Sequence, residues 1–188
     1  MNHTQNLNLP QFAETDRIHH DDFNEAFDKI DAAVPAMPVC KLMDFTTTEA
    51  TAGIEINFHT ANIDTTQYAQ LKIICTFRGG GYYVRINNQA GGYRASSSFS
   101  GAPSSESYLL HANADTSPIV ADITITAVPE IDVIGHMVCG MENTTVTGSY
   151  GSCRLGNGED LESIQFVSSS VNNQFAAGAH IVVYGLRA

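Results

Sequence analysis

Residues 119–128 read IVADITITAV, and residues 53–58 read GIEINF. Apolar and polar side chains alternate along both stretches, which is the pattern of a half-buried β-strand. Their Ile, Val and Thr residues are β-branched and pack well on a pleated sheet. The two stretches therefore predict a β-rich fold.

Similar runs lie on both sides of these two stretches. Gly- and Asn-rich turns separate them, such as Gly79-Gly80-Gly81 and Asn172-Asn173. About ten short strands at this spacing predict a β-sandwich or barrel over residues 39–188. The polar segment 89–106 is expected to be a long exposed loop with at most a short edge strand. The predicted strands cover residues 39–45, 53–59, 71–78, 82–88, 107–112, 119–128, 133–140, 144–150, 161–168 and 179–186.

A helix is predicted over residues 20–34, HDDFNEAFDKIDAAV, followed by a linker to residue 38. Asp21 or Asp22 can cap its positive end, and Pro35 stops it. Its apolar residues are spaced 4, 3 and 4 apart, which is coiled-coil spacing. Two interpretations stay open: the helix packs on its own domain, or it bundles with copies of itself. The seam consists of Phe23, Phe27, Ile30 and Val34.

Residues 1–19 are polar and Asn-rich. We expect an extended arm that orders only against another molecule. Its isolated apolar anchors are Leu7, Leu9, Phe12 and Ile18.

The 188 residues include 9 Lys and Arg against 20 Asp and Glu, a net charge of -11. This balance argues against a nucleic-acid binder or a polybasic membrane-surface protein, since both need cations. No apolar stretch approaches the roughly 20 residues of a membrane-spanning helix. No secretory signal is recognisable, so we expect synthesis in the cytoplasm without export and no membrane insertion.

Cofactor and metal chemistry is not expected. The cysteines, Cys40, Cys75, Cys139 and Cys153, form no C-x-x-C pair and are interpreted as plain thiols, with Cys75 a small buried hydrophobe. Adjacent His19 and His20 cannot share a helix face, and the segment 156–160 is interpreted as a hairpin turn rather than a calcium loop.

Enzyme signatures such as a nucleophile elbow or a P-loop are not found, and we expect no catalytic activity. The candidate ligand-binding residues flank the Gly-rich turns, and Tyr93 and Arg94 in GGYRASSS are expected to be exposed. The alternative is that they are ordinary loop residues or contact a neighbouring subunit. The four candidates are Tyr82, Tyr83, Tyr93 and Arg94.

The opening NLNLPQFAETDRIHHDDFNEAFDKIDAAV resembles the start of short tail proteins from phages and prophages of Gram-positive gut bacteria. The closing LESIQFVSSSVNNQFAAGAHIVVYGLRA is similar to the end of tail-fibre and receptor-binding heads, with Phe175, Gly178, Tyr184 and Gly185 at the matching positions. Leu71, Ile73, Arg85 and Asn87 fit the first strands of such heads. Residues 89–160 match least.

The resemblance implies a homotrimeric receptor-binding protein at the tail tip or baseplate of a virion. Residues 1–19 would attach to the baseplate, and residues 20–38 would form a three-helix bundle with the Phe23 seam on its axis. Residues 39–188 would be a jelly-roll-like head that binds host cell-wall polysaccharide. One alternative is a structural baseplate or fibre-adaptor subunit without receptor contact, and another is a small glycan depolymerase.

Overall fold

The structure is a computed structural model, and the chain divides into two compact units, Met1–Pro38 and Val39–Ala188. Each unit is described by itself. The residues that the structure describes are 2–3, 9–11, 20–33, 38–96, 98, 102, 104–112, 118–127, 133–141, 146–155, 159–169 and 174–187.

The first unit contains two short strands and a helix. Strands β1 (Asn2–His3) and β2 (Pro10–Gln11) pair antiparallel. Of the predicted anchors, Leu9 is half-buried. The other three, Leu7, Phe12 and Ile18, lie outside the described residues.

The predicted helix is present as α1 (His20–Ala33). Asp21 and Asp22 occupy its first turn, where carboxylates favour the positive end of the helix dipole. Phe23 and Phe27 are 45% and 60% exposed, and Ile30 is half-buried. Val34, the last residue of the predicted seam, is outside the described part. The seam therefore shows two exposed aromatic rings, and its bundling stays a prediction.

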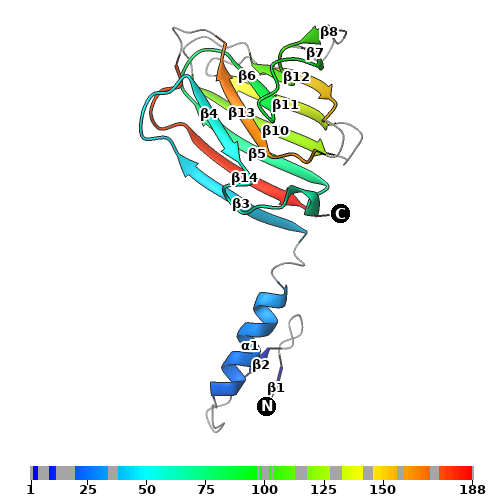
Figure 1. Ribbon diagram of the computed structural model, residues 1–188. Coiled ribbons are helices and arrows are strands. Elements are labelled where there is room, and N and C mark those ends of the chain that lie inside the picture. Colours follow the sequence, from blue (N-terminus) through cyan, green and yellow to red (C-terminus); the bar gives the residue numbers. More distant parts are fainter. Residues whose placement is uncertain are drawn as a thin grey trace. The chain divides into compact units, whose positions relative to one another are not determined.

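The second unit is mainly β and consists of two antiparallel sheets, as the alternating sequence predicts (Figure 1). The larger sheet has eight strands in the order β3 (Val39–Thr46), β14 (His180–Leu186), β5 (Gln70–Phe77), β10 (Ile119–Ala127), β11 (Val133–Met141), β12 (Val146–Cys153), β7 (Tyr93–Ser96) and β8 (Ser104–Glu106). The smaller sheet has the order β4 (Gly53–Asn57), β13 (Ser163–Ser168), β6 (Tyr82–Ile86) and β9 (Leu110–Ala112).

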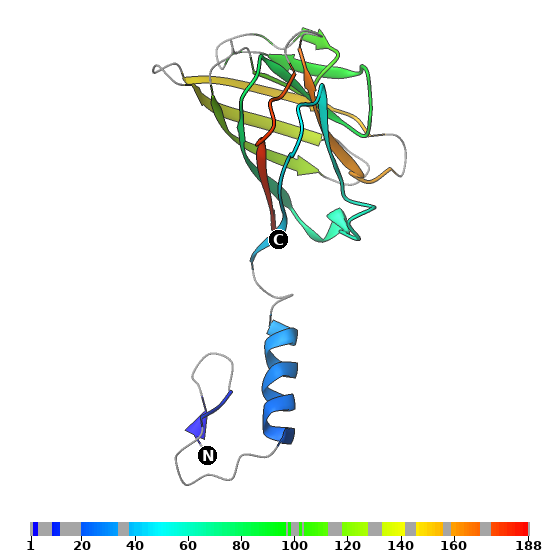
Figure 2. The same cartoon turned by 90° about the vertical axis from the view of Figure 1, so that its left-hand side faces the viewer.

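The core consists of buried apolar side chains from both sheets. Figure 2 shows the strands of this unit in a second view. Alternate residues of each strand point inward, so β10 buries Ile119, Ala121, Ile123 and Ile125 and exposes or half-exposes the residues between them. Aromatic rings from both sheets meet at one place in the core. The members of this cluster, with centroids 5.1–6.1 Å apart, are Phe77, Tyr82, Phe166 and Phe175.

The prediction for residues 89–106 was wrong in one respect. This segment supplies β7 and β8 at the edge of the larger sheet, and Tyr93 and Ala95 of β7 are fully buried. The segment is polar because the residues between the inward ones are Ser and Arg, so its average composition hides two core residues.

All four cysteines are free, as predicted, and Cys75 is buried among apolar side chains. Burial also raises the pKa of its thiol well above the ordinary value. Within the described part of the chain, no helix is both long and apolar enough to cross a membrane.

Candidate functional site

The four predicted ligand-binding residues do not share a surface. Tyr82 and Tyr93 are fully buried, so the expectation that Tyr93 is exposed was wrong. Tyr83 lies on the outer face of the smaller sheet, whereas exposed Arg94 lies on the outer face of the larger sheet. Successive side chains of a strand point to opposite faces, and this separates Tyr82 from Tyr83 and Tyr93 from Arg94.

The two buried tyrosines use their hydroxyl groups inside the core. Tyr82 donates to Sδ of Met137 at 3.3 Å. The Tyr93 hydroxyl accepts from the backbone N–H of Ile86 at 3.0 Å and lies 3.1 Å from the carbonyl oxygen of Gln89. Burial raises the pKa of Tyr93 to about 12. Both residues therefore stabilise the fold and are closed to a ligand.

Tyr83 belongs instead to a group of three half-buried rings, here called the aromatic shelf: Tyr83, Tyr108 and His111. The rings of Tyr83 and Tyr108 are stacked, with centroids 4.7 Å apart and planes inclined by 14°. His111 lies opposite Tyr83 on β9, with its ring centroid 4.8 Å from that of Tyr83 and 5.3 Å from that of Tyr108. The shelf is therefore a partly exposed group of mutually packed rings on one face of the sandwich.

A polar strip runs beside the shelf on the same outer face and consists of Glu55, Gln165 and Arg85. Gln165 is the cross-strand partner of both other residues, and its amide donates to Oε1 of Glu55 at 3.3 Å. Nε of Arg85 donates to the carbonyl oxygen of Ser107 at 3.0 Å, immediately before Tyr108. The strip thus holds a carboxylate, an amide and a guanidinium next to the rings.

A shallow hollow of about 140 Å³ lies at the β4 and β13 side of this face. Val167, which lines it, is the cross-strand partner of both Gly53 and Tyr83. The hollow, the strip and the shelf are therefore neighbours across four adjacent strands. Its lining residues are Gly53, Ile54, Glu55, Gln165, Phe166 and Val167.

The shelf is expected to be uncharged at neutral pH. Burial lowers the pKa of His111 below its ordinary value of 6.5, while the Glu106 carboxylate opposes this in part. Burial, followed by the charge of Glu106, raises the pKa of Tyr108. A neutral imidazole and a phenol can both donate and accept hydrogen bonds, which suits a ligand rich in hydroxyl groups.

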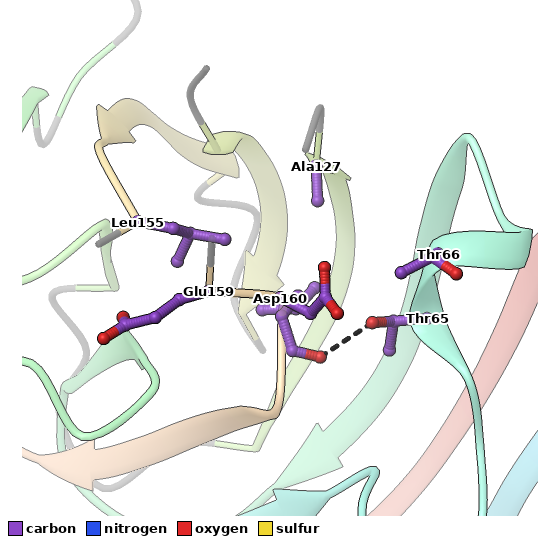
Figure 3. Close-up of a pocket in the computed structure, with 7 residues that line it drawn as sticks. Thr65, Thr66, Ala127, Leu155, Glu159 and Asp160 are labelled. Carbon is purple, nitrogen blue, oxygen red and sulfur yellow. Dashed lines mark hydrogen bonds between the residues drawn. The ribbon is translucent and has the colours of Figure 1, made fainter. Parts of the chain in front are cut away.

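Figure 3 shows a second feature, a hollow between the 3₁₀ turn η2 (Thr65–Gln67) and the segment before β13. The Thr65 hydroxyl donates to the carbonyl oxygen of Leu161 at 2.8 Å across it. Its volume is about 20 Å³, which is room for about one water molecule. It is too small for an organic ligand.

The neighbouring hollow is larger, about 150 Å³, and its lining includes His59, Asp64, Asp160 and Glu162. The Asp64 carboxylate makes its hydrogen bonds within its own turn: it accepts from the hydroxyl of Thr66 and from the side-chain amide of Gln67. These hydrogen bonds lower the pKa of Asp64. The described residues contain no group of three or more His, Cys, Asp or Glu side chains placed to hold a metal. The aromatic shelf is the better candidate site.

Sequence reasoning found Tyr83 but missed Tyr108 and His111. The alternation in YYVRI was the available signal, since it places Tyr83 and Arg85 on the face opposite Tyr82. Nothing in the local sequence indicates that SYLLHA brings two more rings to Tyr83, because that contact depends on the pairing of β6 with β9. No protein-family model matches this chain, and no curated protein shows significant similarity to it.

Proposed function

We propose that the chain is a receptor-binding protein of a phage tail and that its β unit binds host surface glycan through the aromatic shelf. The single observation that carries the glycan-binding part is the stacking of Tyr83 on Tyr108 beside a polar strip. Aromatic rings offer rigid apolar area, while a few polar groups orient a ligand. A sugar ring matches this combination because its C–H face is apolar and its rim carries hydroxyl groups.

The ligand class favoured by the charges is a neutral saccharide. Arg85 contributes one positive charge to the strip, and Glu55 contributes one negative charge. An anionic sugar would be repelled by the carboxylates of Glu55 and nearby Glu106. A neutral polysaccharide would not be repelled by either carboxylate.

The strand order supports a jelly-roll-like head. The chain alternates between the two sheets through β3, β4, β5 and β6. It alternates again through β9, β10, β13 and β14, if β11 and β12 are counted as a hairpin added to the larger sheet. The remaining strands extend the larger sheet. Such alternation between two packed sheets is the connectivity of jelly rolls.

The proposed assembly is a homotrimer with α1 as its bundle and residues 1–19 as the baseplate attachment. A shallow site binds one sugar weakly, and three copies presented together raise the effective concentration of the site. Exposed Phe27 and Phe23 on α1 support the bundle, since burial of each ring would contribute about 2 kcal/mol.

The test uses the full chain on an array of bacterial glycans and on purified walls of Gram-positive gut bacteria. We expect binding of the wild type and a loss of at least about tenfold in affinity for Tyr83→Ser with Tyr108→Ser. Arg94→Ala is the matched control, because Arg94 is exposed on the opposite face and should leave binding unchanged. If the double variant binds with the affinity of the wild type, the aromatic shelf is not the binding site. Absence of binding to every wall preparation would favour the adaptor alternative.

A further inference from the structure

The exposed apolar side chains of the second unit are gathered on one sheet. Among the described residues of that unit, every large apolar side chain with high exposure lies on a strand of the eight-stranded sheet. The half-buried rings and polar residues of the candidate site lie on the other sheet. These exposed apolar residues are Val39, Ile74, Val120, Ile134, Val138 and Val146.

Cross-strand pairing makes the central members neighbours. Ile74 on β5 and Val138 on β11 both pair with Asp122 on β10, so the three residues form one row. Val120 lies two residues from Asp122 on the same face and is 54% exposed. The outer face of an antiparallel sheet that meets only water is normally polar at such positions. An uncovered face would therefore leave these apolar side chains in contact with water.

The charged side chains of this face, unlike those of the chain as a whole, carry no negative excess: two ion pairs lie on β3, β5 and β10, and exposed Arg94 on β7 adds one positive charge. Lys72 and Asp122 form an ion pair at 3.0 Å, and Lys41 and Asp44 form another at 3.1 Å. The chain as a whole carries a net charge of -11, so copies that met through its acidic surfaces would repel. A face without negative excess, with apolar residues between paired charges, is a surface through which this acidic chain can meet another copy without repulsion.

The face is large enough to supply more than half of the area of a specific contact. Its five central strands, from β14 to β12, are about 4.8 Å apart and run for about seven residues at about 3.3 Å each. This gives on the order of 500 Å² in projection and more as accessible surface. Specific interfaces bury roughly 800 Å² per partner.

We infer that the outer face of the eight-stranded sheet, centred on Ile74, Val120 and Val138, is a contact surface between copies of this chain. The inference rests on the proposed assembly into homotrimers, but not on glycan binding. In a cyclic trimer this face of each copy meets a different surface of the next copy. Contact through this face leaves the aromatic shelf, on the other sheet, open to solvent. The α1 seam and this face would then stabilise the same assembly from two places in the chain.

The test measures self-association of the full chain by analytical ultracentrifugation over a range of concentrations. We expect Val120→Asp with Val138→Asp to raise the apparent dissociation constant at least about 30-fold, since each buries a carboxylate in the contact. Thr76→Asp is the second variant, because Thr76 is already exposed and pairs directly with Val120, so the fold is preserved. Ala90→Asp adds the same charge on an exposed turn and should change nothing.

Equal dissociation constants for the wild type and a folded Thr76→Asp or double variant would overturn the inference, as would a wild type that stays monomeric throughout the range. The result is independent of receptor recognition. If the wild type binds no wall preparation but Thr76→Asp still weakens association, the glycan proposal fails and the contact surface stands.

Discussion

The side-chain amide of Asn87 donates to the carbonyl oxygen of Asp160 at 2.7 Å, and its Oδ1 accepts from the backbone N–H groups of Glu162 and Ser163 at 2.8 and 3.0 Å. One side chain in the turn after β6 therefore satisfies three backbone groups of the segment that enters β13. Asn87 also has a φ of 48°, in the left-handed region that Asn tolerates better than most residues.

Asn87→Ala is expected to lower the free energy of unfolding by about 2–4 kcal/mol, measured by urea denaturation. Asn88→Ala is the matched control. Asn88 has a φ of 59° in the same turn, but its side chain is hydrogen-bonded to the side-chain amide of half-buried Gln165 rather than to backbone groups. Both variants suffer similar backbone strain, so the difference between them compares the three hydrogen bonds of Asn87 with the single bond between Asn88 and Gln165. Equal destabilisation would show that the three bonds contribute no more than that single one.

Tyr82 and Tyr83 are adjacent, but their truncation should cost very different amounts of stability. Tyr82→Ala empties a core position among three Phe rings and should cost about 3–5 kcal/mol of stability. Tyr83→Ala removes a half-buried surface ring and should cost about 1 kcal/mol or less. Thermal unfolding followed by circular dichroism compares the two. A Tyr83 variant as unstable as the Tyr82 variant would mean that the shelf is a structural element rather than a binding surface.

Two glycines of neighbouring strands provide a packing test. A Cβ at Gly151 would lie 2.1 Å from the carbonyl oxygen of Leu109, whereas a Cβ at Gly140 would meet nothing within 4 Å. Gly151→Ala should therefore destabilise the protein by about 2–3 kcal/mol, because a backbone atom must move. Gly140→Ala should be nearly neutral. Chemical denaturation of both variants measures the difference, and a stable Gly151→Ala would show that the carbonyl group of Leu109 can move away from β12 at little cost.

The pH dependence of stability should include a contribution from His111. Its pKa is lowered by burial, so between that pKa and 6.5 the unfolded chain binds more protons than the folded one. The free energy of unfolding should consequently fall as the pH drops below about 6.5. His111→Gln should flatten this part of the profile, measured by urea denaturation from pH 7.5 to 5. An unchanged slope in His111→Gln would assign the effect to other groups.

The α1 seam gives a prediction about assembly. Phe27→Asp places a carboxylate where the bundle would bury a ring, so the mass measured by light scattering should fall from three chains toward one at low concentration. Asn24→Asp adds an equal charge at an exposed position of the same helix and should keep the wild-type mass. A trimer that persists in Phe27→Asp at all dilutions would mean that the β unit alone holds the copies together.

Local patterns predicted most of the fold. Alternation located strands such as β4 and β10, because a strand buried on one face must repeat its apolar residues every second position. The helix was readable from its capping aspartates, its seam and Pro35. Segment 89–106 was misjudged because its strands are short and only Tyr93 and Ala95 carry the apolar signal.

The candidate site could be predicted only in part. Tyr83 could be identified from the sequence. Its contacts with Tyr108 and His111 could not, because they join residues about 25 positions apart through strand pairing. The same reasoning could not separate Tyr93 from Arg94 by burial, since both follow a Gly-rich turn. Which of them is inward depends on the register of β7 with β12.

The sequence alone determined that this chain is mainly β, carries one amphipathic helix, bears a strong negative charge and has plain thiols, because periodicity, spacing and composition are local properties. Only the tertiary structure decided that Tyr82 and Tyr93 are core residues, that three rings form a shelf on the smaller sheet, and that the exposed valines gather on the larger one. These depend on which strands pair and in which register, and a shift of one residue reverses every side chain of a strand. That choice is made by the packing of the whole core and not by any single segment.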